Sequence, residues 1–303
     1  MTETKTGYSA GRPPAASTGS PQAQSAGPVR RSGPLAPPAV AATAAPRRLT
    51  FGPVHQNTGH RCVLYGPGGI GKTTLAAQAP GPVAFIDLDD SLPRLRPNLE
   101  AAGLMANIRN VPVETWAELM GVLQSDGWDE IKTLCIDSGT KAEELAVAHT
   151  LETVLVDGRR VNSIEGYGFG KGYGYVFDTF LPMLAALDRH CRSGRNVVLI
   201  CHDCTSTVPN PAGEDWLRYE PRLQSPASGK ASIRLRVREW ADHVLFLGYD
   251  VDVTKDGKGR GIGTRTLYPA ELPHCMAKSR TCGEAMGVGT GRDGAEVWGS
   301  VIR

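Results

Sequence analysis

Eight consecutive residues have the types and spacing of a phosphate-binding loop. Gly66 to Thr73 read Gly-Pro-Gly-Gly-Ile-Gly-Lys-Thr and match the pattern G-x-x-x-x-G-K-[ST]. Glycines lack a Cβ, so the backbone can aim its N–H groups at phosphate oxygens. Lys72 then places a charge on the β- and γ-phosphates, and the Thr73 hydroxyl binds Mg²⁺. The pattern predicts a nucleoside triphosphate site at Gly66, Pro67, Gly68, Gly69, Ile70, Gly71, Lys72, Thr73 and Thr74.

An acid ends a second apolar run downstream of this loop. Asp137 follows Thr133–Ile136, and a carboxylate at the end of such a strand can hold Mg²⁺ beside the threonine of the loop. A helix N-cap is the alternative, because Asp and Ser favour that position. The glycine-rich loop upstream favours the metal role.

A third carboxylate has the position of a general base. Asp89 comes just after the apolar run Val83–Leu88, where it could orient an attacking water and accept its proton. Asp87 and Asp90 compete for this role, and Asp87, which lies inside the apolar run, has a structural alternative. We expect Asp89 to be catalytic.

One histidine ends the apolar run Asn196–Cys201. His202 could donate to the γ-phosphate and sense its loss, or simply bond to backbone groups. A zinc site is a weaker alternative, suggested by the C-x-x-C pattern of Cys201–Cys204. No second C-x-x-C pair exists, and Cys201 should point into the core.

Apolar strands alternating with helices must position these residues. Such alternation predicts an α/β fold with a mostly parallel sheet and helices on both faces. Ligands in these sheets lie at the carboxyl ends of the strands, so the loop, Asp89, Asp137 and His202 should share one edge. We expect strands at 62–65, 83–88, 131–136 and 196–201, helices at 73–79, 114–123, 141–155 and 176–187, and a helix stop at Pro93. Residues 205–230 are polar without a period, and short β-like segments follow at 243–247, 264–268, 276–280 and 296–302.

Composition indicates a soluble protein for most of the chain. Of 303 residues, 41% are hydrophobic and 21% charged, and the net charge of +2 means that any nucleic-acid site must be a local patch. No apolar run approaches the roughly 18 residues of a membrane helix, and there is no signal-peptide core. The seven scattered cysteines suit reduced thiols, so we expect a cytoplasmic protein.

The first 48 residues differ from the rest. They are rich in Pro, Ala, Ser and Gly and have no hydrophobic period, so we expect a disordered, mildly basic tail. Their scarcity of acids also fits a transit peptide, although no clear amphipathic helix supports that alternative. Residues 49–303 should form the ATPase-like domain.

Several segments together resemble one family. They are the loop with its preceding tyrosine, the Phe85–Asp89 run, Cys135–Ser138, the Gly170–Tyr173 loop, Leu199–His202, Glu239–Asp242 and Ala277–Arg280, in this order. The chain from about residue 49 to 303 resembles the phage-type RecA-like P-loop ATPases of the Sak single-strand-annealing group. The resemblance implies a RecA-like core with the His202 strand between the strands that carry the loop and Asp137.

This resemblance also implies functional residues. Asp89 falls at the catalytic carboxylate position, where RecA itself has a glutamate, so turnover is expected to be slow. Lys278 and Arg280 are implied to reach the nucleotide of a neighbouring subunit. Their alternative is a solvated strand face.

Two loops are implied to face DNA. Tyr167, Phe169 and Lys171 offer aromatic rings interleaved with charge, as in single-strand stacking platforms, or else pack as a glycine-rich turn on the core. The second loop contributes the cations Arg218, Arg222 and Lys230.

Together with this resemblance, the sequence predicts an ATP- and Mg²⁺-dependent ATPase, and the resemblance implies that it binds single-stranded DNA and promotes annealing or recombination. The expected form is a homo-oligomer, ring or filament, with nucleotide between subunits and a single-strand-binding protein as a potential partner. Alternatives are a loader or motor ATPase acting on a protein and a nucleotide-gated binder with little hydrolysis. A small-molecule kinase fits less well because the chain has no arginine-rich lid.

Overall fold

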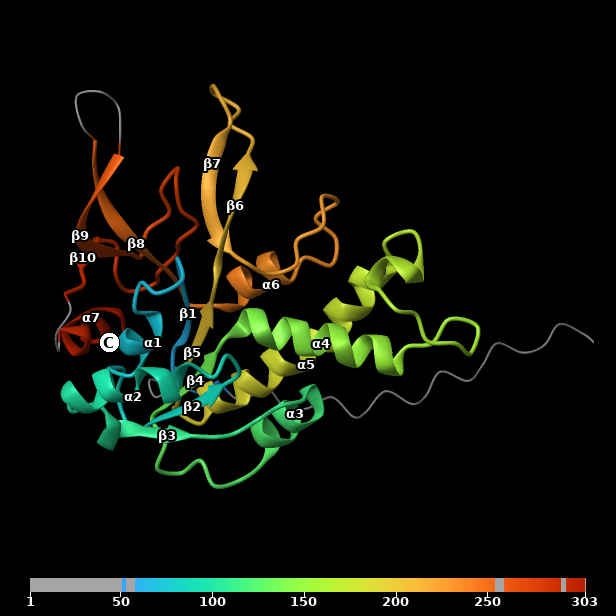
Figure 1. Cartoon of the computed structure of the whole chain (residues 1–303), viewed down its shortest axis with the longest axis horizontal. Coiled ribbons are helices and arrows are strands. Elements are labelled where there is room, and N and C mark those ends of the chain that lie inside the picture. Colours follow the sequence, from blue (N-terminus) through green and yellow to red (C-terminus); the bar gives the residue numbers. More distant parts are fainter. Residues whose placement is uncertain (1–50, 53–57, 254–258, 290–292, 303) are drawn as a thin grey trace, which may run out of the picture. The chain divides into compact units, whose positions relative to one another are not determined.

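Short apolar strands and amphipathic helices alternate through the computed structural model, as the sequence pattern predicts (Figure 1). The structure describes residues 51–52, 58–253, 259–289 and 293–302. The predicted tail at 1–48 lies outside these residues and stays a prediction. The unit Val54–Arg303 contains all the elements given below.

Strands and helices alternate up to α4, and two helices, α4 and α5, separate β4 from β5. The first half contains β1 (Arg61–Tyr65), α1 (Lys72–Ala76), β2 (Val83–Asp87), α2 (Ser91–Ala101), β3 (Ile108–Asn110), α3 (Trp116–Gln124), β4 (Thr133–Asp137) and α4 (Gly139–Thr153). The second half contains α5 (Lys171–Arg192), β5 (Asn196–Cys201), β6 (Asp203–Val208), β7 (Trp216–Pro221), α6 (Ile233–Trp240), β8 (His243–Val253), β9 (Gly259–Tyr268), β10 (Met286–Gly287) and α7 (Gly294–Val301). Two 3₁₀ turns, Met105–Asn107 and Ile164–Tyr167, complete the set.

One eight-stranded sheet organises the unit, in the order β10-β9-β8-β1-β5-β4-β2-β3. The strands from β8 to β3 are parallel, and β9 pairs antiparallel with β8 and β10. The strand β5 that precedes His202 lies between β1 and β4, as the family resemblance implies. A parallel sheet of this order with helices on both faces is the RecA-like P-loop fold.

Each face of the sheet carries its own apolar core. Along β1, Val63 and Tyr65 pack on the face covered by α3, α4, α5 and α6, whereas Cys62 and Leu64 pack on the face covered by α1, α2 and α7. This alternation follows from the two-residue period of a strand. Because both faces are covered, the strands read as continuous apolar runs, and Cys62, Cys135 and Cys201 are buried free thiols.

The helix α2 corrects the expectation that Pro93 stops a helix. Pro93 occupies the first turn of α2, where its missing N–H has no intrahelical partner in any case. The Asp87 carboxylate accepts hydrogen bonds from the backbone N–H groups of Ser91 and Leu92, at 2.9 and 2.7 Å. The side chain of Asp87 therefore supports the start of this helix, which runs on to Ala101.

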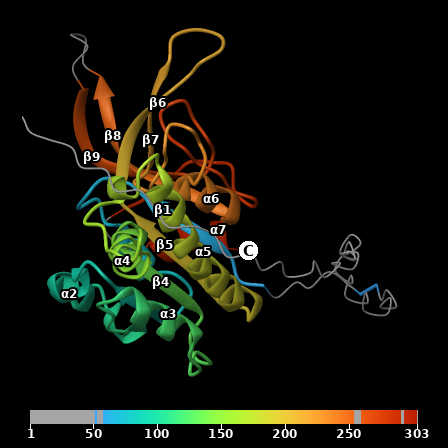
Figure 2. The same cartoon turned by 90° about the vertical axis from the view of Figure 1, so that its right-hand side faces the viewer.

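Three expectations for the second half of the chain are also corrected. Part of the polar stretch 205–230 forms the antiparallel hairpin β6–β7, which projects from the sheet in both Figure 1 and Figure 2. The segment expected to be a strand at 296–302 is instead helix α7, whose Val297, Trp298 and Val301 face the core at helical spacing. Residues 276–280 form no strand, only one bridge from Lys278 to Val244.

No helix in the described ranges combines the length and the apolarity needed to cross a bilayer.

Candidate functional site: a nucleotide cavity at the carboxyl edge

The glycine-rich loop links the end of β1 to the start of α1 through backbone angles that favour glycine. Gly66 has φ 154°, and a Cβ there would lie 2.1 Å from the Leu247 carbonyl oxygen of β8. Gly71 has φ 102°, and a Cβ would lie 2.1 Å from the Arg265 guanidinium. A side chain at either position would displace its neighbour, so the loop can curl this tightly only with glycine.

The Lys72 ammonium lies inside this curled loop. Its Nζ donates to the carbonyl oxygens of Gly66 and Pro67, at 2.7 and 2.9 Å. Burial lowers the pKa of Lys72, partly offset by the nearby Asp137 carboxylate. The charge is therefore held at the loop, where phosphate oxygens of a nucleotide would replace the carbonyls.

Asp137 and Thr73 form the pair of oxygen groups expected of a magnesium site. The Thr73 hydroxyl donates to Asp137 Oδ2 at 2.6 Å, and the Asp137 residue is only 4% exposed. Burial raises the pKa of Asp137 to about 6. Mg²⁺ prefers hard oxygen ligands, usually one or two carboxylates with phosphates and waters, so this donor set fits the ion.

Asp89 and His202 meet beside this pair. His202 Nε2 lies 3.3 Å from Asp89 Oδ2, which brings together the ends of two strands that are not neighbours in the chain. The contact with His202 is the largest cause of the lowered pKa of Asp89, with a further contribution from the Ser138 hydroxyl. The carboxylate is therefore ionised and able to accept a proton.

A cavity of about 1120 Å³ joins these groups. Lys72, Thr73, Asp89, Asp137 and His202 all line it. The sheet topology explains this convergence, since β1, β2, β4 and β5 are parallel and end at the same edge. The Asp87 carboxylate, by contrast, accepts hydrogen bonds from the backbone of α2. Of the two candidate bases on this segment, Asp89 is therefore the one that lines the cavity.

Arg94, Asn98 and Arg265 are among the lining residues that the sequence prediction did not include. Arg94 and Asn98 lie one turn apart on α2, and their i, i+4 spacing could have been noticed had Pro93 not been taken as a helix stop. Arg265 comes from β9, and its guanidinium donates to the carbonyls of Ile70, Val288 and Gly289. Nothing in the sequence signals this contact, because it joins the loop to residues about two hundred positions away.

Lys278 and Arg280 make contacts within their own chain. The Lys278 ammonium donates to the carbonyl oxygens of Arg238, Glu239 and Ala241, at 3.1, 3.4 and 2.6 Å, and so caps the C-terminus of α6. Arg280 pairs with Asp242 at 3.0 Å while its side chain is 63% exposed. Their predicted action on a neighbouring subunit remains a prediction.

Two of the predicted DNA-binding residues are not available in this structure. Tyr167 is 6% exposed and donates its hydroxyl to the Thr150 and Val154 carbonyls at 3.0 Å, so it is a core residue instead of a stacking platform. Arg218 has a side chain only 11% exposed and pairs with Glu220 and Glu271. Both corrections arise because a sequence does not reveal which aromatic ring or cation finds an internal partner.

The other four predicted DNA-binding residues are exposed. Phe169 is fully exposed, and Lys171, Arg222 and Lys230 have exposed side chains. The two segments that carry them are held together, because Gln224 Nε2 donates to the carbonyls of Tyr173 and Ala231 at 2.9 and 2.8 Å. We call Phe169, Lys171, Arg222 and Lys230 the loop surface.

The strand order, the glycine-rich loop and the Thr73–Asp137 pair define a P-loop NTPase of RecA-like fold. Residues 58–281 match the model of the AAA_24 family, described as an AAA domain, and the chain belongs to this family. No curated protein matches the sequence.

Two solved structures are similar in shape. A KaiC-like protein of the hyperthermophilic archaeon Pyrococcus horikoshii has a TM-score of 0.43 and 16% identity, over 78% of this chain and 88% of that chain. The flagellar accessory protein FlaH of Methanocaldococcus jannaschii has a TM-score of 0.37 and 13% identity, over 70% of this chain and 78% of that chain. Likenesses at this level carry no argument about function.

Proposed function

We propose that this chain binds ATP with Mg²⁺ and hydrolyses it. The observation that carries the proposal is the convergence of Lys72, the Thr73–Asp137 pair and the ionised Asp89 on one cavity. These are the groups that phosphoryl transfer to water requires, namely a phosphate cradle, a magnesium site and a base.

Each residue has a stated task in this proposal. Lys72 and the backbone N–H groups of the loop bind the β- and γ-phosphates and stabilise the charge that develops there. Mg²⁺, when held by Thr73 and Asp137, supplies further positive charge beside the phosphates. Asp89 orients the attacking water and accepts its proton.

His202 positions the Asp89 carboxylate for this role. Its ring contacts the carboxylate, while its backbone N–H donates to the Thr140 hydroxyl at 3.1 Å. Asp89 is one methylene shorter than the glutamate of RecA, so the water sits closer to the β2 end. We expect turnover that is slow until a bound polymer adjusts this geometry.

We further propose that the polymer is single-stranded DNA and that the chain acts as the Sak-type annealing ATPases do. The loop surface supports this, because it joins an exposed ring to three exposed cations. Phosphate contacts and base stacking are the two contributions that single-strand binding uses. A single-strand-binding protein would be a natural further partner.

An oligomer, ring or filament, is part of the same proposal. Arg280 is largely exposed and could approach the nucleotide of a neighbouring subunit. Lys278 could do so only after leaving the carbonyl groups of α6. We therefore expect Arg280 to be the more effective of the two in an assembly.

A protein partner is the second candidate, and the hairpin β6–β7 favours it. Trp216 and Leu217 on this hairpin are 40% and 67% exposed, next to the exposed acids Glu214 and Asp215. Acids repel a phosphate backbone, whereas exposed apolar side chains beside polar ones suit a protein surface. In that case the chain is a loader or motor ATPase.

One experiment separates these candidates. Phosphate release by the full chain is measured with ATP and Mg²⁺, alone and with a single-stranded oligonucleotide at low salt, and again with a chain that begins at Leu49. If DNA stimulates hydrolysis in the chain without the tail, and this stimulation is lost in Lys171→Ala and Lys230→Ala, single-stranded DNA is supported as the bound polymer. No binding and no stimulation by DNA would leave the protein-partner ATPase as the better proposal. No hydrolysis at all, despite ATP binding, would indicate a nucleotide-gated binder.

A further inference from the structure

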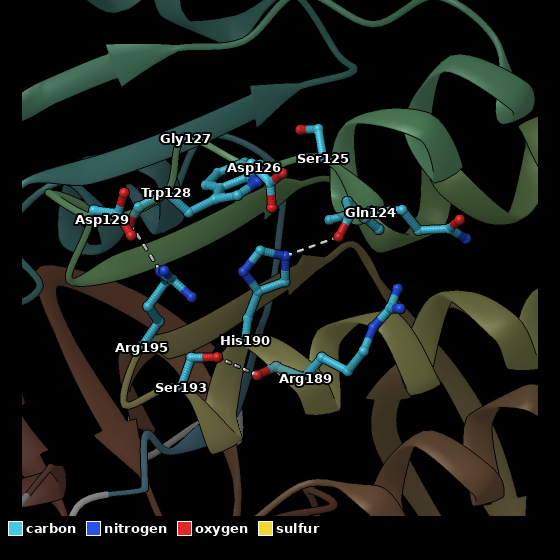
Figure 3. Close-up of a pocket in the computed structure, with 11 residues that line it drawn as sticks. Gln124, Ser125, Asp126, Gly127, Trp128, Asp129, Arg189, His190, Ser193 and Arg195 are labelled. Carbon is cyan, nitrogen blue, oxygen red and sulfur yellow. Dashed lines mark hydrogen bonds between the residues drawn. The ribbon is translucent and has the colours of Figure 1, made fainter.

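A second hollow lies far from the nucleotide cavity, at the amino ends of β4 and β5. It has a volume of about 400 Å³ and lies between the loop after α3 and the turn after α5 (Figure 3). Strand β4 runs from this end of the sheet to Asp137, and its four steps from Thr133 to Asp137 span roughly 13 Å at about 3.3 Å per residue. The two cavities therefore belong to opposite edges of the sheet.

Two buried nitrogen atoms beneath this hollow have no hydrogen-bond partner. They are His190 Nδ1 and Trp128 Nε1, on side chains that are 5% and 7% exposed. Together with Leu123, at 2% exposure, these residues form the floor, while the other lining residues are more exposed. A buried polar group without a hydrogen-bond partner destabilises the fold, so a ligand that pairs both atoms removes that cost.

The hydrogen bonds around His190 settle what each nitrogen needs. His190 Nε2 lies 3.1 Å from the Leu123 carbonyl oxygen, which accepts only, so Nε2 carries the proton. Burial lowers the pKa of His190, the Leu123 hydrogen bond partly offsets this, and Arg195 and Arg189 lower the pKa further, which favours the neutral ring. Nδ1 is then an acceptor that lacks a donor, and the Trp128 indole N–H is a donor that lacks an acceptor.

The two rings hold this arrangement in place. Their planes meet edge to face at 78°, with centroids 4.9 Å apart. Arg195 fixes both sides of the hollow, because its Nε donates to the Trp128 carbonyl at 2.9 Å and its backbone N–H donates to the His190 carbonyl at 3.1 Å (Figure 3). The floor is therefore preorganised.

The charges on the rim balance, so together they favour neither an anion nor a cation. Arg189 and Arg195 oppose Asp126 and Asp129 around the opening. Helices α3 and α5 both end here, and the negative ends of their dipoles disfavour an anion, whereas the two arginines disfavour a cation. A neutral molecule with a donor beside an acceptor matches the floor and the rim together.

We propose that this hollow is a binding site for a small neutral ligand with a carboxamide or lactam group. The amide N–H of the ligand donates to His190 Nδ1, and its carbonyl oxygen accepts from Trp128 Nε1. A volume of about 400 Å³ suits a molecule of one or two rings. Both nitrogens are buried, so the ligand reaches them only when the exposed residues 124–127 that line the hollow give way.

The test titrates the full chain with benzamide and with 2-pyridone, which represent the amide and lactam sources. The readout is the indole ¹H–¹⁵N NMR signal of Trp128, identified by its absence in Trp128→Phe. Two matched compounds serve as controls, namely N,N-dimethylbenzamide, which lacks the N–H, and benzoate, which is charged.

Saturable movement of the Trp128 signal with benzamide or 2-pyridone, but not with the two controls, supports the proposal. Ligand-observed NMR should then show binding weakened about tenfold in Trp128→Phe and in His190→Phe, the loss of one hydrogen bond each. Trp216→Phe, on the distant hairpin, should bind as the parent does. Thermal unfolding confirms that each variant is folded, and Trp128→Phe keeps the test decisive if His190→Phe is not.

The proposal is overturned by several results. Equal binding of benzamide and its dimethyl form would show that the donor is irrelevant. An unmoved Trp128 signal at saturating solubility of both probes would show that the hollow takes no amide. A high-resolution crystal structure with a single water bridging the two nitrogens, with and without benzamide, would reduce the hollow to a hydration site.

Discussion

Two carboxylates at the end of β2 allow a paired test of the proposed base. Asp89 contacts His202 and lines the nucleotide cavity, whereas Asp87 accepts hydrogen bonds from the first turn of α2. The substitutions Asp89→Asn and Asp87→Asn change the same group by the same atoms. The structure predicts that one variant loses catalysis and the other loses stability.

The expected magnitudes follow from these contacts. An asparagine at position 89 cannot accept a proton, and a general base contributes about 10²–10⁴-fold to rate. The contact with His202 that is weakened is partly exposed, so its loss costs only about 0.2–1 kcal/mol of folding free energy. An asparagine at position 87 keeps one acceptor oxygen and loses one of two N–H bonds, about 1 kcal/mol, or roughly 2–4 °C in melting temperature.

The assay compares three quantities in both variants. Phosphate release at saturating ATP and Mg²⁺ gives kcat, titration with a fluorescent ATP analogue gives affinity, and thermal unfolding gives stability. Asp89→Asn should bind the analogue as the parent does and hydrolyse at least a hundredfold more slowly, at the low end of the range for a general base. Asp87→Asn should retain the rate within a few-fold and melt earlier.

The reverse pattern would refute the assignment. If Asp87→Asn abolishes turnover while Asp89→Asn retains it, the base is Asp87, inside the strand, and not Asp89. A large fall in nucleotide affinity in Asp89→Asn would show instead that this carboxylate orders the binding site.

Four further results are expected. Lys72→Ala should abolish hydrolysis and weaken ATP binding, and a wild-type rate in the purified variant would place the phosphates elsewhere. The activity of Thr73→Val should be partly rescued by excess Mg²⁺. An unchanged metal dependence in this variant would contradict the role of Thr73 as a magnesium ligand. Lys278→Ala should lower the melting temperature because three carbonyls at the end of α6 lose their donor. If Lys278 also acts between subunits, mixing the Lys278→Ala protein with the Lys72→Ala protein should restore activity. Proven co-assembly of the two variants without activity would exclude that role. Burial and the neighbouring His60 lower the pKa of His243 from 6.5 to about 4 in the folded chain. As the pH falls below 6.5, the histidine is therefore protonated in the unfolded chain before it is protonated in the folded chain. The free energy of unfolding then decreases as the pH falls. In urea unfolding, this group should decrease the free energy of unfolding by about 2 kcal/mol between pH 7 and pH 5. An equal decrease in His243→Gln would show that the effect does not come from His243.

Short sequence patterns predicted which residues line the nucleotide cavity, because in each pattern the spacing of a few neighbouring residues fixes the local backbone. The loop from Gly66 to Thr73 needs only its glycines, its lysine and its threonine in order. The positions of Asp137 and His202 followed from one rule, that the ends of parallel strands meet at one edge, and the strand order agrees with it. The roles of these residues remain predictions.

Predictions that depended on a single residue type were less successful. Pro93 was expected to stop a helix, but a proline is tolerated in a first turn whose N–H groups have no helical partner. Tyr167 was expected at a DNA surface because of the family resemblance and its place among aromatic rings interleaved with charge, yet its ring is buried and its hydroxyl is bonded, as in the alternative of a turn packed on the core. Residue type alone does not distinguish an exposed ring from a buried one.

The sequence by itself determined the phosphate-binding loop, the alternation of strands and helices, and the acids and histidine that follow the strands. Each of these depends on neighbours within a few residues, where spacing and chemistry are written directly in the chain. Only the tertiary structure decided that Arg265 grips the loop, that Lys278 caps α6 and that Arg218 is internally paired. Those contacts join residues 37 to 195 positions apart, and the partner of a long cation depends on which segments the fold brings within its reach.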